Sequence, residues 1–96
     1  MSVKMIQILE CAADAEKAFE QELKKLVETS LCEDGCIKYE IYQPVDQDGQ
    51  YIMIEEWLDE DAFTQHQDSP HYKHFVRISP ALQNKPAEVK QLIRLV

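Results

Sequence analysis

Polar side chains placed among apolar neighbours are the first candidates for chemistry in this sequence. Glu55 lies between Met53 and Trp57 on one face of an expected strand. A buried carboxylate must find a hydrogen-bonding or charged partner, or keep its proton through a raised pKa. Glu55 could therefore be a general acid or base. The alternative is a structural hydrogen bond to the backbone, to Arg77 or to Arg94.

Three histidines, His66, His71 and His74, fall within nine residues of one another. A single histidine is a suitable proton shuttle because its pKa lies near physiological pH. The alternative is that His66 ties its helix to the sheet while His71 and His74 are solvated. H-x4-H-x2-H is not a recognised ligand spacing, so no metal site is expected.

The charge and composition exclude several classes of function. Eighteen Asp and Glu against ten Lys and Arg give a net charge of −8 over 96 residues, which repels nucleic acids and anionic membranes. Two glycines are too few for a phosphate-binding loop, and no apolar run approaches the roughly 18 residues that span a bilayer. Cys11, Cys32 and Cys36 form no CxxC motif, which favours a reduced, cytoplasmic protein. We expect one domain, residues 1–96.

The first half of the chain predicts a strand, a long helix and a second strand. Apolar residues over 5–11 predict a strand buried on both faces. From Asp14, a good N-cap, apolar side chains recur at steps of three and four, which predicts an amphipathic helix of about five turns that Gly35 ends. Residues 36–43 alternate as a strand does, and residues 46–49 are a strong turn signal.

The second half completes a recognisable order of elements. Residues 51–58 predict the hairpin partner, Asp59 caps a short helix to about Gln67, and Ser69-Pro70 begins another to about Ile78. Residues 88–96 predict a closing strand. The order β-α-β-β-α-β is that of the α+β ferredoxin-like fold, an antiparallel sheet with helices on one face.

The strand at 51–58 also predicts an assembly. It is apolar on both sides, and Tyr51, Met53 and Trp57 share one of them. If that face were the one without helices, it would expose an apolar patch of several hundred Å², more than monomers usually tolerate. Two sheets packed face to face in a homodimer would cover it and enclose a space lined by aromatic side chains.

Two segments give the chain a resemblance to a known family. Residues 52–66 (IMIEEWLDEDAFTQH), followed by Ser69-Pro70-His71, resemble the pattern of the antibiotic biosynthesis monooxygenase (ABM) family. That pattern has Glu-x-Trp, an acidic helix start, an alanine with an aromatic residue or leucine, a histidine and a short Ser/Thr-Pro-His step. Residues 33–39 (EDGCIKY) resemble the family's entry to the second strand. Each motif is short, but the resemblance extends over nearly the whole chain.

The resemblance implies a dimeric α+β barrel with a pocket in each protomer. The nearest branch resembles small quinol monooxygenases, which oxidise quinols or phenols with O2 and need no metal or flavin. By motif position, His66 is the expected base or hydrogen-bond anchor, and Glu55 orients or tunes a partner. The expected substrate-binding residues are Trp57, Tyr39, Met53, Tyr51 and His71, with Trp57 and Tyr39 as walls and His71 at the mouth.

The family resembled here is functionally mixed, so other activities stay open. One branch resembles autoinducer-degrading isomerases, which move protons on a small phosphorylated ketone without O2; Lys38, Arg77 and Arg94 are the cations that could bind its phosphate. Another branch degrades haem and relies on an asparagine in the first strand, where this chain offers Gln7. A third possibility is a dimeric binding module for aromatic metabolites with no catalysis.

Overall fold

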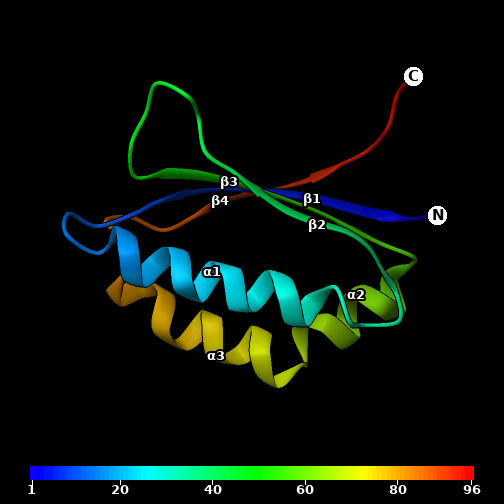
Figure 1. Ribbon diagram of the computed structural model, residues 1–96. Coiled ribbons are helices and arrows are strands. Elements are labelled where there is room, and N and C mark those ends of the chain that lie inside the picture. Colours follow the sequence, from blue (N-terminus) through cyan, green and yellow to red (C-terminus); the bar gives the residue numbers. More distant parts are fainter.

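The computed structural model describes residues 1–96 as a four-stranded sheet with three α-helices (Figure 1). The elements follow one another as β1 (Val3–Glu10), α1 (Glu16–Ser30), β2 (Cys36–Tyr42), β3 (Gln50–Trp57), α2 (Glu60–Gln67), α3 (Pro70–Ile78), a 3-10 turn (Ser79–Ala81) and β4 (Glu88–Leu92). The predicted α+β ferredoxin-like fold is confirmed, with the second helical crossover divided into α2 and α3.

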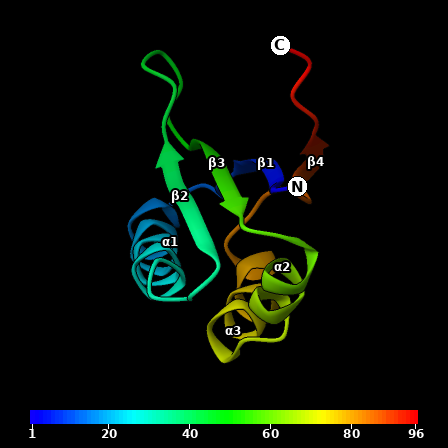
Figure 2. The same cartoon turned by 90° about the vertical axis from the view of Figure 1, so that its right-hand side faces the viewer.

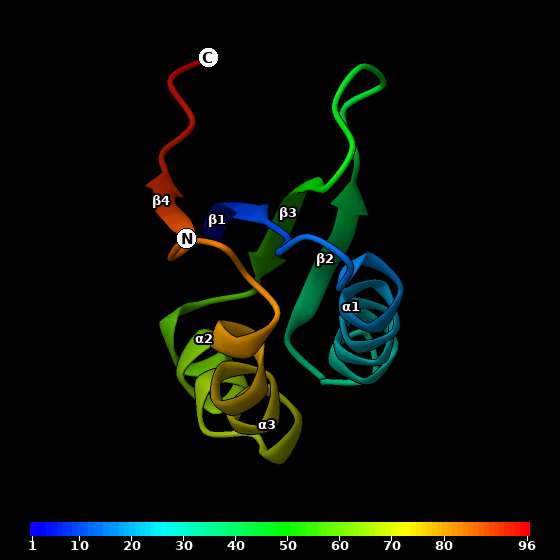
Figure 3. The ribbon, with the colours of Figure 1, turned by 90° about the vertical axis from the view of Figure 1, so that its left-hand side faces the viewer.

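The sheet has the strand order β2-β3-β1-β4, and all neighbouring strands are antiparallel. All three helices lie on one face of it, as Figures 2 and 3 show from opposite sides. Side chains alternate across a strand, so every second residue of β3 is buried under the helices. The apolar core between sheet and helices consists of Val3, Leu9, Cys11, Phe19, Leu23, Leu26, Tyr39, Tyr51, Met53, Trp57 and Phe75.

The helix-free face of the sheet is not the one that the sequence suggested. Tyr51, Met53 and Trp57 lie on the helix-covered face and need no second chain to bury them. The opposite face carries an apolar surface of paired strand residues that are half-buried or exposed. These residues, called the open-face patch below, are Ile6, Ile8, Tyr42, Ile52, Ile54 and Leu92.

Both expected ends of helix α1 differ from the prediction. Asp14 has a φ of 65°, a left-handed conformation that aspartate tolerates in turns, so the cap position falls on Ala15, with no side-chain hydrogen bond. The helix ends at Ser30, well before Gly35. Gly35 has another role: a Cβ at this position would collide with Cβ of Ala62 on α2.

The starts of the other two helices are confirmed. Asp59 caps α2 by accepting a hydrogen bond from the Ala62 amide at 2.8 Å. Ser69 caps α3 through the Tyr72 amide, and Pro70 takes the first helical position. A proline fits there because its missing N–H has no helical partner in any case. The two caps thus fix where each helix begins.

The first and last strands of the chain, β1 and β4, differ from the prediction. β1 begins at Val3 and, within one chain, only its helix-facing side is covered, so the expected burial of both faces is wrong here. β4 is a short exposed strand that ends at Leu92. Residues 93–96 project from the sheet away from the helices, as does the β2–β3 loop (Figure 1). None of the helices combines the length and the apolar character that crossing a membrane requires.

The close approach of Gly35 and Ala62 leads to a stability prediction. Gly35→Ala should lower the free energy of unfolding by about 1–3 kcal/mol, because the added methyl group forces the 31–35 turn and α2 apart. Chemical denaturation measures the change. The double variant Gly35→Ala/Ala62→Gly adds a methyl group at residue 35 and removes the one it would collide with at residue 62. It should recover most of the lost free energy of unfolding. If the double variant were less stable than Gly35→Ala, the contact would not be the cause.

Candidate active site

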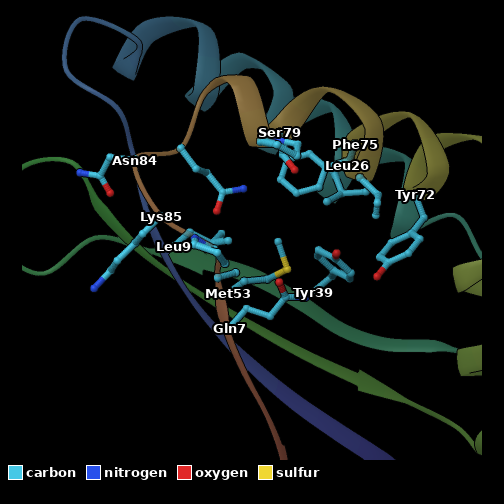
Figure 4. Close-up of a pocket in the computed structure, with 15 residues that line it drawn as sticks. Gln7, Leu9, Leu26, Tyr39, Met53, Tyr72, Phe75, Ser79, Asn84 and Lys85 are labelled. Atoms are coloured by element: carbon cyan, nitrogen blue, oxygen red, sulfur yellow. The ribbon is translucent and has the colours of Figure 1, made fainter.

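A pocket of about 430 Å³ lies between the sheet and helix α3 (Figure 4). Its sheet side is formed by Gln7, Leu9, Tyr39 and Met53, and its helix side by Leu26, Tyr72, Phe75 and Ser79, while Asn84 and Lys85 lie at the far end. Val76, Pro80, Gln83, Pro86 and Ala87 complete the lining. An apolar cavity of this size with a few polar groups is typical of a small-molecule site.

Two polar atoms in the pocket lining, the Tyr39 hydroxyl and Gln83 Oε1, are buried without a well-formed hydrogen bond, although the Ser30 side chain lies close to the Tyr39 hydroxyl and lowers its pKa. An unsatisfied buried polar group costs about 1–3 kcal/mol, so each atom is suited to bind a ligand or water. Burial and, after it, the charge of Glu55 raise the pKa of Tyr39 far above its usual value. The Tyr39 hydroxyl therefore keeps its proton and is a hydrogen-bond donor.

His66, in the last turn of α2, lies behind the tyrosine wall of this pocket and is fully buried. Its imidazole stacks on Trp57 with ring centroids 4.4 Å apart. The rings of Tyr72 and Tyr39, both of which line the pocket, are 4.9 and 5.5 Å away. Side chains from β2, β3 and α3 thus hold the imidazole in one orientation.

Glu33, in the turn after α1, determines which nitrogen of His66 is free. Its Oε2 lies 2.7 Å from His66 Nδ1. An ionised carboxylate only accepts hydrogen bonds, so Nδ1 carries the proton and Nε2 has a lone pair. Nε2 is buried and has no partner. This arrangement is a carboxylate-oriented imidazole, the usual support of a general base.

Burial keeps this imidazole neutral. Desolvation lowers the pKa of His66 below the 6.5 of a free side chain, because a buried imidazolium loses its hydration. The hydrogen bond and charge of Glu33 act in the opposite direction, and the nearby His71 lowers the pKa further. At neutral pH the dominant form of His66 therefore has a free Nε2 that can accept a proton.

His71, in the first turn of α3, binds the same carboxylate oxygen. His71 Nε2 lies 2.8 Å from Glu33 Oε2 and 3.2 Å from the Ser69 hydroxyl. Because the Ser69 hydroxyl donates to the His66 carbonyl at 2.6 Å, it accepts from His71, and Nε2 carries the proton. Glu33 thus joins two histidines, one buried and one partly exposed.

Glu33, His66 and His71 could also be read as a metal site. One donor atom from each lies within 4.8 Å of the others, and two imidazoles with a carboxylate suit several transition metals. In this geometry, however, both nitrogens lie at hydrogen-bond distance from one oxygen, so the three groups satisfy one another. Glu33 lies more than 30 residues before His66 in the sequence, so the spacing of the histidines gives no sign of this third donor.

Glu55 is 2% exposed and is paired within its own strand. Trp57 Nε1 donates a hydrogen bond to Glu55 Oε1 at 2.7 Å, where the sequence suggested the backbone, Arg77 or Arg94. Burial raises the pKa of Glu55, while the hydrogen bonds of Trp57 and Gln7 oppose this effect. Since Trp57 stacks on His66, Glu55 lies behind the aromatic layer that supports the imidazole.

The predicted site residues separate into two groups. Tyr39 and Met53 line the pocket, whereas His66, Glu55, Trp57 and His71 form the adjoining buried network. Tyr51 belongs to neither group, because its hydroxyl donates to Glu20 at 2.5 Å under helix α1; its role in substrate binding stays a prediction. A large side chain on the correct face thus reaches a different part of the core.

Sequence reasoning missed Glu33, Gln7, Tyr72 and Gln83. Glu33 stands in the quoted EDGCIKY segment, and Tyr72 directly follows the Ser-Pro-His step, so both had a local signal. Gln83 lies in the irregular segment between Pro80 and Pro86, where no periodicity indicates a direction. It is the fold that brings this segment back beside the end of β1, at the Cys11–Gln83 bridge.

The sequence of the chain matches a family as well as a fold. The sequence model of a family described as "Antibiotic biosynthesis monooxygenase" matches residues 1–78, which include both Glu33 and the two histidines that it binds. The chain belongs to the antibiotic biosynthesis monooxygenase family. The resemblance seen in its motifs is thereby confirmed.

Two curated relatives show how far the similarity extends. "Uncharacterized protein sll1783" of Synechocystis sp. is 38% identical over 64 residues, which are 67% of this chain and 44% of that protein, so the match spans less than half of its length. "Putative monooxygenase YcnE" of Bacillus subtilis is 31% identical over 71 residues, 74% of this chain and 75% of YcnE. The second relative therefore corresponds to most of this ABM domain.

A solved structure confirms the architecture of the family domain. The structure of Rv0793 from Mycobacterium tuberculosis superimposes with a TM-score of 0.93 at 27% sequence identity and covers 100% of this chain and 97% of that one. The agreement includes the elements that place His66, Glu33 and the pocket. The names of the family and of YcnE both include monooxygenase, so membership of the family supports an oxidoreductase role.

Proposed function

We propose that this ABM protein is a cofactor-independent monooxygenase that oxidises quinol- or phenol-like aromatic molecules with O2. One observation carries the proposal: a neutral, buried imidazole, oriented by Glu33 and with Nε2 free, stands beside an aromatic-lined pocket. Deprotonation turns a quinol into an electron-rich anion that can pass an electron to O2 without a metal or flavin. The protein must then supply a base, orientation and exclusion of water.

The atoms balance for a hydroquinone substrate. The substrate loses a proton to the base and transfers one electron to O2, and the resulting radical pair combines at a ring carbon. One oxygen atom stays in the product, a hydroxyquinone, and the other leaves as water. The four-electron reduction of O2 is thus matched by oxidation of the substrate alone.

The buried network and the pocket wall would divide the work of this reaction. His66 is the candidate base, and a proton on Nε2 would create an imidazolium paired with Glu33. The protonated Tyr39 hydroxyl would donate to the phenolate oxygen and stabilise its charge. A phenolic oxygen at this end of the pocket would provide the Tyr39 hydroxyl with a partner. His66 Nε2 is free but lies behind Tyr39 and Tyr72, so the proton would reach it through a bound water or a tyrosine hydroxyl.

The charges near the pocket favour this reaction over the isomerase alternative. A phosphorylated ketone would need cationic groups in the pocket. Lys85 is the one lysine or arginine in the lining, and its ammonium binds Glu10 at 3.2 Å. Lys38, Arg77 and Arg94, the cations considered from sequence, do not line it. An uncharged aromatic substrate fits this lining better than an anionic one.

We further propose that the protein forms a homodimer through its open-face patch. Within each chain, Ile6 and Ile8 of β1 lie beside Ile54 and Ile52 of β3 on a face that no helix covers. Burial of such a surface is favourable by roughly 25 cal/mol per Å². Packing two such faces would give the dimeric α+β barrel that the family resemblance implies.

We propose that the protein is cytoplasmic, and the state of its cysteines supports this location. Cys11, Cys32 and Cys36 are all free thiols in the structure. Free thiols persist in reducing compartments and tend to oxidise outside them.

Oxygen consumption tests the proposed reaction. A panel of benzene- and naphthalene-hydroquinones is screened with an oxygen electrode, and the enzyme-free autoxidation rate is subtracted. We expect enzyme-dependent O2 uptake with at least one quinol, unchanged after dialysis against a chelator, and no turnover under argon. Turnover that continues under argon would favour the isomerase alternative. Saturable binding without turnover of any compound would favour the binding module.

The pH profile tests the pairing of Glu33 with His66. Activity requires neutral His66, so kcat/KM should fall as pH drops through the pKa of His66, which lies below 6.5. The Glu33 carboxylate raises that pKa, so Glu33→Gln should move the acidic limb to lower pH and lower the maximal rate about tenfold. Glu28 is an exposed residue of helix α1. The control variant Glu28→Gln removes the same charge without touching His66. An unmoved limb in Glu33→Gln would contradict the pairing.

A further inference from the structure

Glu33, His66 and His71 bring three donor atoms together from separate parts of the chain. Both imidazoles direct a ring nitrogen at the same carboxylate oxygen, His66 Nδ1 at 2.7 Å and His71 Nε2 at 2.8 Å. A ligating nitrogen points its lone pair where its N–H bond otherwise points. The protons on these two nitrogens therefore occupy the place that a metal ion would take, and the cluster can hold either two protons or one ion.

The change from hydrogen bonds to coordination requires only a small displacement. In a tetrahedral zinc site, with bonds of about 2.0–2.2 Å, neighbouring nitrogen and oxygen ligands lie roughly 3.3 Å apart. The two nitrogen–oxygen distances here are shorter by about half an ångström, and the three donor atoms all lie within 4.8 Å of one another. The long side chain of Glu33, which stands in a turn, can supply this displacement while the helices stay in place.

The cluster is accessible from the helical surface of the protein. The His66 side chain is completely buried, whereas those of Glu33 and His71 are 19% and 20% exposed. His71 also lines a groove of about 370 Å³ between α1 and α3. Water in this groove would supply a fourth ligand, and two imidazoles with one carboxylate and one water form a common zinc site. The net charge of −8 further favours the approach of a cation.

A metal ion on Nδ1 would reverse the tautomer of His66. A neutral imidazole carries one proton, so the proton of His66 moves to Nε2 when Nδ1 binds the ion. The proton of His71 likewise moves from Nε2 to Nδ1, and no proton leaves the cluster. His66 Nε2 then carries a hydrogen and no longer has the lone pair that accepts a proton from a substrate.

From these observations we propose that Glu33, His66 and His71 form a binding site for one divalent transition-metal ion such as Zn²⁺, and that the bound ion inactivates the base by occupying His66 Nδ1. The binding of the ion depends only on the three donor groups, whereas the inhibition rests on the proposed function. In the active protein the same groups hold protons. The ion is thus an inhibitor and not a cofactor.

Binding of the metal alone tests the site without requiring turnover. The untagged protein is dialysed against a chelator and titrated with ZnCl₂ by isothermal titration calorimetry, and Co²⁺ then replaces Zn²⁺ for visible spectroscopy. We expect one ion per chain and the intense visible bands of four-coordinate Co²⁺. Because the ion binds the folded state, Zn²⁺ should also raise the midpoint of thermal unfolding. Absence of one-to-one binding at micromolar Zn²⁺ would overturn the proposal.

Three variants locate the ion. His71→Asn and Glu33→Gln each remove one donor and should weaken Zn²⁺ binding about 100-fold or more, since even residues that only orient a ligand contribute about 10- to 100-fold. Thermal unfolding without metal shows that each variant is folded. His74→Gln, the control, removes the exposed histidine that contacts Glu22 in the same groove, and should leave binding unchanged. Binding that survives in both donor variants, or disappears in His74→Gln, would overturn the proposed site.

Rates of O2 uptake test the effect of the ion on His66. Saturating Zn²⁺ should lower the rate with the best quinol by about 100-fold, the contribution of a positioned general base, and excess chelator should restore it. Zn²⁺ bound at the cluster with an unchanged rate would overturn the inhibition, although the quinol reaction would stand. Zn²⁺ binding that both donor variants lose, without O2 uptake for any quinol, would support the metal site and overturn the monooxygenase reaction.

Discussion

Replacing His66 by glutamine should lower kcat for quinol oxidation by about 100-fold or more, the usual contribution of a positioned general base. Glutamine has a similar size and retains a polar end, but its amide cannot accept a proton at neutral pH. The loss should appear in kcat more than in KM, because His66 lies behind Tyr39 and Tyr72 and does not line the pocket. Initial rates of O2 uptake with the best quinol of the panel measure it.

His74→Gln is the matched control for this variant. His74 is an exposed histidine of α3 that binds Glu22 and Arg77 at the surface, and its replacement should leave the rate within twofold. Because His66 is buried, calorimetric ligand binding and thermal unfolding of His66→Gln show whether the pocket remains intact. A His66→Gln or His66→Ala protein that keeps its full rate would exclude His66 as the base.

Introducing a lysine at Ile54 should separate the proposed homodimer into monomers. Ile54 is half-buried at the centre of the open-face patch, beside Ile6 of β1 and Glu40 of β2. Burying an ammonium in the dimer interface costs several kcal/mol of lost hydration, which pairing with the neighbouring Glu40 offsets only in part, so the dissociation constant should rise at least 100-fold. Light scattering at micromolar concentration should then report 11.2 kDa for the variant and twice that mass for the wild type.

Val45→Lys is the control for the added charge. Val45 is fully exposed in the β2–β3 loop, so the same substitution there should not change the mass in solution. A wild-type protein that is monomeric at micromolar concentration would contradict the dimer. It would leave the His66 network in place, since every member of that network comes from a single chain.

Local patterns were sufficient to predict the fold. The alternation in β2 and β3, the cap residues Asp59 and Ser69 and the order of the elements all carry their signal within a few residues. The errors arose where the signal is tertiary. Gly35 was interpreted as a helix stop, although its contact with Ala62 is what requires a glycine. Alternation also identifies two strand faces without saying which one the helices cover.

The candidate site was only partly predictable for the same reason. His66, Glu55 and Trp57 could be selected because each is a polar or aromatic residue in an informative local pattern. Their arrangement depends on contacts between residues far apart in the chain, such as that of Glu33 with His66 and His71. Tyr51 and Trp57 lie on the same strand face, yet only Trp57 contacts the imidazole. Gln83 lies in an irregular segment whose position depends on the whole fold.

The turn at 31–35 has a consequence for how the protein responds to heat. This short segment carries Glu33, and its Gly35 carbonyl accepts the Leu58 amide at 2.8 Å at the end of β3. Turns open at lower free energies than core strands. Warming should therefore release the carboxylate from its imidazole before the sheet melts, and the temperature optimum should lie below the midpoint of global denaturation.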